Sequence, residues 1–198
     1  MRVTIFDYGA GNMYSLAKAF RLVDGEVAVE SDARRALDTD LFVLPGVGAF
    51  GTAAARLAPN RDRIRDAIDA GLPTLGICLG MQLLFERSDE GDGEGLGVFA
   101  GRVTRLNARR APQIGWNAID ESSDPAIARA GLTTAYYANG YACRPPDAEA
   151  VTAWSTHEAD RFPAIVRRGA VVGVQFHPEK SSAPGLAFLR AVVDEARS

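Results

Sequence analysis

The chain has 198 residues, 47% of them apolar, and its 22 Lys and Arg residues against 25 Asp and Glu residues give a net charge of −3. This length and composition predict one domain, spanning residues 1–198, with a full hydrophobic core. The charges form no basic stripe, so nucleic acid is not an expected partner. No apolar run approaches the roughly 20 residues that cross a bilayer. Because Asp7 also interrupts the N-terminal run before a signal-peptide core is complete, we expect a cytoplasmic protein without a membrane partner.

The first half of the chain alternates strand-like and helix-like segments. Apolar runs of strand length lie at residues 3–6, 27–29, 41–44 and 75–77, and helical patterns lie at 12–23, 33–37, 61–70 and 79–86. Such alternation predicts an α/β fold in which helices cover a parallel sheet.

The second half holds more strand-like runs and fewer helices. They lie at residues 102–106, 116–119, 134–137, 151–154, 164–166 and 171–176, and a closing helix begins near residue 184. These runs predict antiparallel additions and hence a mixed, largely parallel sheet. An acidic segment at residues 88–95 is predicted to be a mobile loop.

Cys78 stands on the turn between a predicted strand and a predicted helix. Gly76 and Gly80 flank it at the spacing of a nucleophile elbow, where a tight turn needs small neighbours and holds the nucleophile outward. The partial positive charge of a helix N-terminus favours a thiolate and can bind an oxyanion, with the N–H of Leu79 as the first candidate donor. The pattern therefore favours a nucleophilic cysteine.

A candidate base and its orienting group lie near the end of the chain, in His177-Pro178-Glu179. Proline disfavours the helical region for the residue before it, so His177 is expected to be extended. Residues i and i+2 of an extended segment share one face, which brings the Glu179 carboxylate to the imidazole. Together with Cys78 these residues predict a catalytic triad.

Each candidate also has an ordinary structural interpretation. A free cysteine is usually a small buried hydrophobe, and a histidine at a strand end is usually structural, but the combination of elbow glycines with His-x-Glu favours catalysis. Cys143 and His157 lack such a setting and are interpreted as structural. Two cysteines and two histidines suggest neither a disulfide framework nor a metal-ligand cluster, so no cofactor is implied.

Two further segments follow predicted strands and therefore belong to the same edge of the sheet, where sites of open α/β sheets form. Gly46-Val47-Gly48 has the backbone freedom for close approach to a substrate, although it also fits a plain glycine turn. The segment after Asp7 invites a dinucleotide-loop interpretation, but Tyr14 stands where the third glycine is required. Dinucleotide binding is accordingly disfavoured.

Five motifs together resemble one known family. They are Asp7-Tyr8-Gly9-Ala10-Gly11-Asn12, Pro45-Gly46-Val47-Gly48-Ala49-Phe50, Gly76-Ile77-Cys78-Leu79-Gly80-Met81-Gln82, Gly115-Trp116-Asn117 and Gln175-Phe176-His177-Pro178-Glu179-Lys180-Ser181. The chain resembles class I (triad-type) glutamine amidotransferases from about Asp7 to Leu189, and among them the glutaminase subunits of imidazole glycerol phosphate synthases. The cysteine motif is shared with CTP synthase, so the motifs at residues 45–50 and 115–117 carry the finer assignment.

The resemblance implies a three-layer α/β/α, flavodoxin-like fold and hydrolysis of L-glutamine to glutamate and ammonia through a cysteine thioester. Ammonia would pass to a cyclase subunit (HisF) within a heterodimer of the histidine pathway, a complex that makes imidazole glycerol phosphate and AICAR. It further implies roles for these residues: Val47 and Leu79 in the oxyanion hole, Gly48, Gln82, Glu90 and Tyr141 in glutamine binding, and Asn12, Trp116 and Lys180 at the partner interface. As ordinary alternatives, Glu90 is a surface acid, Trp116 a half-buried aromatic residue and Lys180 a solvated lysine.

Three positions depart from the commoner family pattern. Asn139 stands where histidine is usual, Gly140 where a hydroxyl residue is usual, and Gln113 where histidine is usual. A side-chain contact to glutamine from residues 139–140 therefore stays open. Three alternatives also stay open: a glutaminase of another synthase, such as the CTP or anthranilate type, a catalytically idle regulatory subunit of the same fold, and a general cysteine hydrolase or peptidase.

Overall fold

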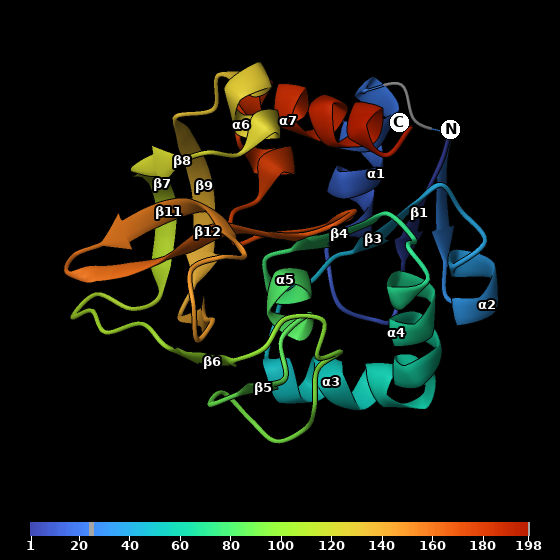
Figure 1. Ribbon diagram of the computed structural model, residues 1–198, viewed down its shortest axis with the longest axis horizontal. Coiled ribbons are helices and arrows are strands. Elements are labelled where there is room, and N and C mark those ends of the chain that lie inside the picture. Colours follow the sequence, from blue (N-terminus) through green and yellow to red (C-terminus); the bar gives the residue numbers. More distant parts are fainter. Residues whose placement is uncertain (24–25, 198) are drawn as a thin grey trace.

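A computed structural model describes residues 1–23 and 26–197, and a large mixed sheet runs through its centre (Figure 1). Within these residues the sheet has eight strands in the order β2-β1-β3-β4-β13-β12-β11-β8. Their bounds are β1 (Arg2–Phe6), β2 (Glu26–Glu30), β3 (Leu41–Leu44), β4 (Thr74–Ile77), β8 (Glu121–Ser122), β11 (Val151–His157), β12 (Asp160–Arg168) and β13 (Val171–Val174). Strands β2, β1, β3, β4 and β13 are parallel, and β12, β11 and β8 add antiparallel pairs.

Helices cover both faces of this sheet (Figure 1). The helices α1 (Met13–Leu22), α6 (Pro125–Ala130) and α7 (Ser182–Glu195) bury their apolar residues in one core, and α2 (Ala33–Ala36), α3 (Phe50–Leu57), α4 (Arg61–Asp69) and α5 (Leu79–Leu83) bury theirs in a second core. Alternation along β3 shows how the sheet separates the cores, because Leu41 and Val43 enter the first and Phe42 and Leu44 the second. The predicted three-layer α/β/α architecture is confirmed.

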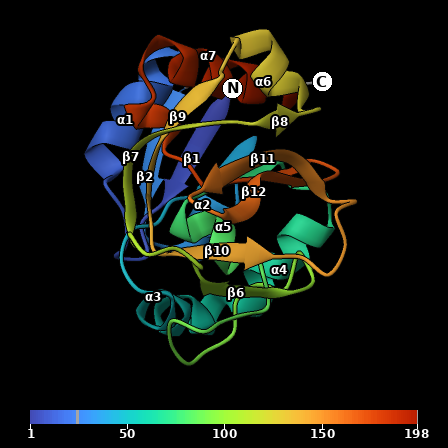
Figure 2. The same cartoon turned by 90° about the vertical axis from the view of Figure 1, so that its left-hand side faces the viewer.

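Two smaller sheets lie beside the large one, on the side that Figure 2 turns toward the viewer. One has the order β10-β6-β5, and the other pairs β7 with β9. Their bounds are β5 (Arg87–Ser88), β6 (Arg102–Arg105), β7 (Gln113–Ala118), β9 (Thr134–Asn139) and β10 (Tyr141–Arg144), and short 3-10 turns η1 (Ala58–Asn60) and η2 (Pro178–Lys180) connect other elements.

Helix α3 was not anticipated from the sequence, and the contact that starts it explains why. Its N-cap residue Ala49 has no side chain able to cap the helix, and the Glu90 carboxylate accepts a hydrogen bond from the Phe50 N–H instead, at 2.8 Å. A capping group 40 residues away leaves no local signal. The same contact anchors the acidic segment that was expected to be a mobile loop.

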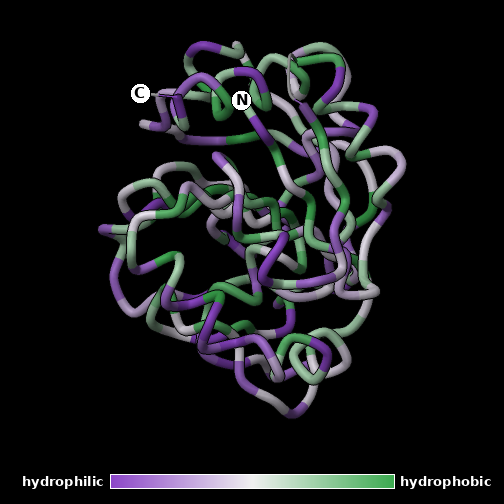
Figure 3. Tube along the Cα trace, turned by 90° about the vertical axis from the view of Figure 1, so that its right-hand side faces the viewer, coloured by the Kyte–Doolittle hydropathy of each residue, from purple (hydrophilic) through white to green (hydrophobic). Residues whose placement is uncertain are grey.

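The helix after Cys78 ends at Leu83, three residues before the predicted end. Helix α6 and strand β10 were likewise not anticipated. Hydrophobic and hydrophilic residues are interspersed along the whole Cα trace (Figure 3). None of the helices in the described part of the chain is long and apolar enough to cross a membrane.

Candidate active site

The candidate nucleophile and base follow two neighbouring parallel strands. Cys78 comes directly after β4 and His177 comes three residues after the end of β13, and the register pairs Ile77 with Val174. The Cys78 N–H donates to the Val174 carbonyl at 2.7 Å, which joins the two chain segments where they leave the sheet. The predicted meeting of these residues at the carboxyl edge of the sheet therefore follows from strand order.

Cys78 has the backbone of a strained turn. Its φ of +54° and ψ of −109° lie where a side-chain-bearing residue is rarely found. A Cβ on Gly76 would lie 2.9 Å from the carbonyl oxygen of Gly80, and a Cβ on Gly80 would lie 1.8 Å from that of Leu44. The two glycines thus let β4, α5 and β3 approach closely enough to form the turn.

The backbone of His177 is held on both sides. Its N–H donates to the Tyr136 carbonyl at 2.8 Å, and its carbonyl accepts from Ser181 Oγ at 2.7 Å. His177 Nδ1 lies 2.9 Å from Glu179 Oε1, and both side chains are almost fully buried. The local geometry differs from the expected extended segment: His177 is extended, but residues 178–180 form the 3-10 turn η2, and this turn brings the carboxylate back to the imidazole.

The electrostatic setting favours a charged His177. Burial alone lowers the pKa of its imidazole, but interactions with Cys78 and Glu179 outweigh burial and raise the pKa from 6.5 to about 10. The raised pKa favours the imidazolium form of His177, next to a sulfur and a carboxylate. Its Nε2 atom is buried and has no hydrogen-bond partner among the described residues, so this atom is available for proton transfer.

The second cysteine, Cys143, lies outside the lining of the pocket beside Cys78. Cys143 lies on β10 with no exposed surface, and burial raises the pKa of its thiol well above the ordinary value. A thiol that stays protonated and covered is a poor nucleophile. In experiments on thiol reactivity, Cys143 therefore serves as the unreactive cysteine with which Cys78 is compared.

A pocket of about 160 Å³ opens beside Cys78. Its lining unites many of the candidate residues from both halves of the chain: Val47, Gly48, Cys78, Leu79, Gln82, Glu90, Ala138, Asn139, Gly140, Tyr141, His177 and Lys180. Glu179 stands behind His177 rather than in this lining, and Asn12 and Trp116 are also outside it. The arrangement can attack a small carbonyl compound, move a proton and offer backbone N–H groups to an oxyanion.

The glycine loop packs against the first turn of α5. A Cβ on Gly46 would lie 2.6 Å from the Leu79 side chain, and Gly48 adopts a φ of +108°. The Tyr8 hydroxyl donates to the Pro45 carbonyl at 2.6 Å, which fixes the start of the loop. Burial is the largest cause that raises the pKa of Tyr8, so its hydroxyl remains a donor.

The other expected substrate residues have additional structural contacts. Glu90 uses one carboxylate oxygen to hold the Phe50 N–H at the end of the glycine loop. Gln82 is 4% exposed, and its Nε2 donates to the Tyr141 carbonyl and to Gln175 Oε1, both at 3.2 Å. These contacts link the pocket wall to the chain behind it.

The three expected partner residues lie in two settings. Trp116 on β7 is 56% exposed and packs edge-on against Tyr136, and Lys180 Nζ lies 5.5 Å from the centre of the same Tyr136 ring. The exposed Trp116 and Lys180 and the half-buried Tyr136 form a cluster beside the pocket. Asn12 instead caps α1, accepting a hydrogen bond from the Ser15 N–H at 3.2 Å.

The unusual residues Asn139 and Gln113 face each other across the β7–β9 pair. Asn139 Nδ2 donates to the Tyr141 carbonyl at 3.0 Å, and Gln113 Oε1 accepts from Asn117 at 3.4 Å. Asn139 lines the pocket and was not assigned a role from the sequence. A second unassigned residue, Gln175, touches the Cys78 sulfur; the signal that could have found it is its position two residues before His177.

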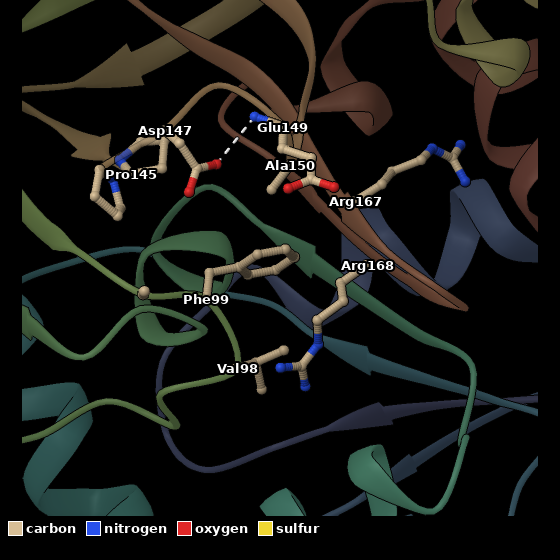
Figure 4. A pocket seen from close by; sticks show the side chains of 10 residues that line it. Val98, Phe99, Pro145, Asp147, Glu149, Ala150, Arg167 and Arg168 are labelled. Carbon is tan, nitrogen blue, oxygen red and sulfur yellow. Dashed lines mark hydrogen bonds between the residues drawn. The ribbon is translucent and has the colours of Figure 1, made fainter.

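A larger cavity of about 510 Å³ lies among Val98, Phe99, Pro145, Glu149 and Arg168 (Figure 4). Its two other charged wall residues are already engaged: Asp147 accepts a hydrogen bond from the Glu149 N–H, and Arg167 pairs with Asp124 and Glu195. The lining contains no thiol or imidazole among the described residues. Volume alone therefore does not identify a reactive site, and the candidate thiol and imidazole both line the smaller pocket.

The family model for class I glutamine amidotransferases matches residues 4–195. In solved structures, a glutamine amidotransferase has 20% identity and a TM-score of 0.75, covering 98% of this chain and 100% of that chain. The "Structure of PurLQS from Thermotoga maritima" has 18% identity and the same TM-score, with 98% of each chain covered. These likenesses show the fold, and the family-model match shows that the chain belongs to the class I glutamine amidotransferase family.

Curated relatives narrow the assignment. The protein named "Imidazole glycerol phosphate synthase subunit HisH" from Symbiobacterium thermophilum is 46% identical, covering 95% of this chain and 91% of its own length. The proteins of the same name from Halobacterium salinarum and Pyrococcus furiosus are 40% and 41% identical, and 97% and 96% of this chain is covered. Within the amidotransferases the chain belongs to the HisH group, which confirms the resemblance noted from the motifs.

Proposed function

We propose that this protein is the glutaminase subunit of an imidazole glycerol phosphate synthase, with Cys78, His177 and Glu179 as its catalytic triad. The observation that supports this most strongly is the strained Cys78 turn beside a buried His177–Glu179 pair, in a chain 46% identical to a relative of the HisH name. The substrate is L-glutamine, and residues 1–198 act as one glutaminase domain.

The first half-reaction forms a thioester. The Cys78 thiolate attacks the side-chain amide carbon of glutamine, and the C=O electron pair moves onto oxygen. The N–H groups of Val47 and Leu79 then bind this oxyanion, and removal of one such donor generally costs on the order of 10²- to 10³-fold in rate. When the oxyanion collapses, the C–N bond breaks, and His177 gives its Nε2 proton to the nitrogen that leaves as ammonia.

The second half-reaction regenerates the thiolate. His177, now neutral, removes a proton from water, whose oxygen attacks the thioester carbon. The C–S bond breaks with its electron pair on sulfur, so glutamate leaves and the imidazolium–thiolate pair is restored. Glu179 holds the imidazole through Nδ1 at 2.9 Å and stabilises its positive charge in both halves.

Glutamine binding is assigned to Gly48, Gln82, Glu90 and Tyr141, which line the pocket around Cys78. The Glu90 carboxylate receives the substrate ammonium with the oxygen that does not hold Phe50. Gln82 and Gly48 fix the rest of the substrate backbone.

Ammonia passes to a cyclase subunit, with which the chain forms a heterodimer that acts as a lyase in histidine biosynthesis. Trp116 and Lys180 contribute to this interface through the cluster that they form with Tyr136, and Asn12 contributes at the start of α1. Exposed Trp side chains are frequent anchors of interfaces. Because the mechanism needs a free Cys78 thiol, the reducing cytoplasm is the proposed location.

The test is glutamate release from glutamine by the purified chain, alone and with a histidine-pathway cyclase and its nucleotide ligand. Cys78→Ala should abolish release while ammonia-supported synthesis by the complex continues. Cys143→Ala is the matched control and should retain turnover, because Cys143 is fully covered and does not line the pocket. Glutamine turnover that persists in Cys78→Ala would reject the assignment.

A further inference from the structure

Gln175 is a fully buried amide that the mechanism above does not use. It follows β13, two residues before His177, and none of its surface is exposed. Its backbone N–H donates to the Ala164 carbonyl at 2.9 Å, which keeps the segment aligned with β12. A buried amide needs partners at both ends, because an unpaired donor or acceptor loses its hydration without compensation.

Both ends of the Gln175 side chain have a partner at the candidate site. Its Nε2 donates to the Cys78 sulfur at 3.7 Å, and its Oε1 accepts from Gln82 Nε2 at 3.2 Å. Gln82 Nε2 also donates to the backbone carbonyl of Tyr141 at 3.2 Å. The result is a continuous chain of amides from the wall of the pocket to the sulfur.

The chemistry of the partners fixes the direction of this chain. A carbonyl can only accept, so Gln82 must present its NH₂ group to Tyr141. The other hydrogen of that NH₂ group then points to Gln175, whose Oε1 must accept it. The NH₂ group of Gln175 is thereby turned toward Cys78, and the assignment of amide nitrogen and oxygen follows from the network.

The Cys78 sulfur also has a contact whose electrostatic effect is opposite to that of the Gln175 N–H. Cys78 Sγ lies 3.9 Å from the Ala138 carbonyl, which can accept a hydrogen bond from a thiol but repels a thiolate. The Gln175 N–H acts in the other sense, since a hydrogen bond is stronger when its acceptor is charged. The Gln175 amide and the His177 imidazole therefore both favour an ionised sulfur, and the Ala138 carbonyl opposes it.

We infer that Gln175 is a positioning residue for Cys78: its amide N–H donates to the Cys78 thiolate and is oriented by Gln82, itself fixed by the Tyr141 carbonyl. The inference rests on the proposed function in assigning Cys78 as the nucleophile. It assigns Gln82 a role behind the pocket wall in addition to its proposed contact with glutamine. Loss of either amide should make the thiolate form less populated at a given pH.

The test is the pH profile of Cys78 alkylation by iodoacetamide, followed on the Cys78 peptide by mass spectrometry. The rate follows the thiolate fraction, and its midpoint does not depend on how easily the reagent enters. In Gln175→Met the midpoint should rise by about one pH unit, with a roughly tenfold slower reaction below it. Gln113→Met removes another buried amide without touching Cys78 and should leave the midpoint unchanged.

A double-mutant cycle tests whether Gln82 acts on Cys78 by orienting Gln175. Gln82→Met alone should move the midpoint in the same direction by a smaller amount, and Gln82→Met with Gln175→Met should match Gln175→Met alone, because the two amides act through one contact. An unchanged midpoint in Gln175→Met would overturn the inference. Should that variant fail to fold, an unchanged midpoint in Gln82→Met would overturn it.

Alkylation requires no glutamine, so the two proposals fail separately. A midpoint that shifts in a chain without glutaminase activity would retain the inference and reject the proposed function. Normal turnover with an unshifted midpoint would retain the proposed function and overturn the inference about Gln175.

Discussion

Replacing Gly80 by Ala tests the proposed origin of the Cys78 turn, because two physical effects predict opposite signs. Alanine in place of glycine in a helix normally stabilises by about 0.5–1 kcal/mol. Here the new Cβ would lie 1.8 Å from the Leu44 carbonyl oxygen, so α5 and β3 must separate by about 1.6 Å to reach an ordinary contact of 3.4 Å. We therefore expect a net loss of about 1–3 kcal/mol in the free energy of unfolding.

The same displacement reaches the proposed nucleophile, Cys78, which lies two residues earlier. A 1 Å misplacement of a reacting group costs on the order of 10²-fold in rate, so Gly80→Ala should lower glutamate release by at least that factor. For a chain of this length the melting temperature should fall by roughly 2–12 °C. Calorimetry measures the melting temperature, and the glutaminase assay with the cyclase present measures glutamate release.

Gly140→Ala is the matched control for stability. Its new Cβ would meet the Pro112 side chain at 3.6 Å, an ordinary contact, so the melting temperature should stay close to that of the wild type. A Gly80→Ala variant with unchanged or raised stability and normal turnover would refute the claim that close approach of α5 and β3 forms the turn.

Glu179→Gln should lower the pKa of His177 and reduce turnover on the order of 10³- to 10⁴-fold, because the imidazole loses its orienting carboxylate. The pKa of His177 in the folded protein is raised from 6.5 to about 10, so the stability that its charged form contributes is complete below pH 6.5 and is lost as the pH rises toward 10. In urea unfolding, the difference in unfolding free energy between wild type and variant should therefore shrink between pH 6.5 and 10. Tyr8→Phe removes the donor to the Pro45 carbonyl and should cost about 1–3 kcal/mol in unfolding free energy, with slower glutamate release; unchanged values would mean that the loop does not depend on this bond. Trp116→Ala should raise the dissociation constant for the cyclase about tenfold or more in a titration, while thermal stability stays near the wild-type value; equal affinity would remove this residue from the interface.

Much of the fold could be predicted from short sequence patterns, because apolar runs and glycine spacing indicate burial and turns within a few residues. Apolar runs at β1, β3 and β4 are buried on both faces, which is the environment that such runs predict. Gly76 and Gly80 could be interpreted without a structure because a turn of this type admits no larger neighbour.

Contacts between distant residues could not be predicted in this way. The start of α3 depends on Glu90, and the route from His177 to Glu179 depends on a 3-10 turn where an extended segment was expected. The contact of Gln175 with Cys78 joins residues 97 positions apart, so the spacing of Gln175 from His177 could suggest its face of the chain but not its partner. At the candidate site, the sequence therefore indicated which residue types take part, and the structure supplied their partners.

The most direct test of the central claim is covalent trapping of Cys78. The complex with a cyclase would be treated with an electrophilic glutamine analogue, and the modified peptide located by mass spectrometry. We predict one adduct on Cys78, none on the buried Cys143, and protection by excess glutamine. Modification at another residue, or no adduct on Cys78 in a complex that turns over glutamine, would contradict the assignment of Cys78 as the nucleophile.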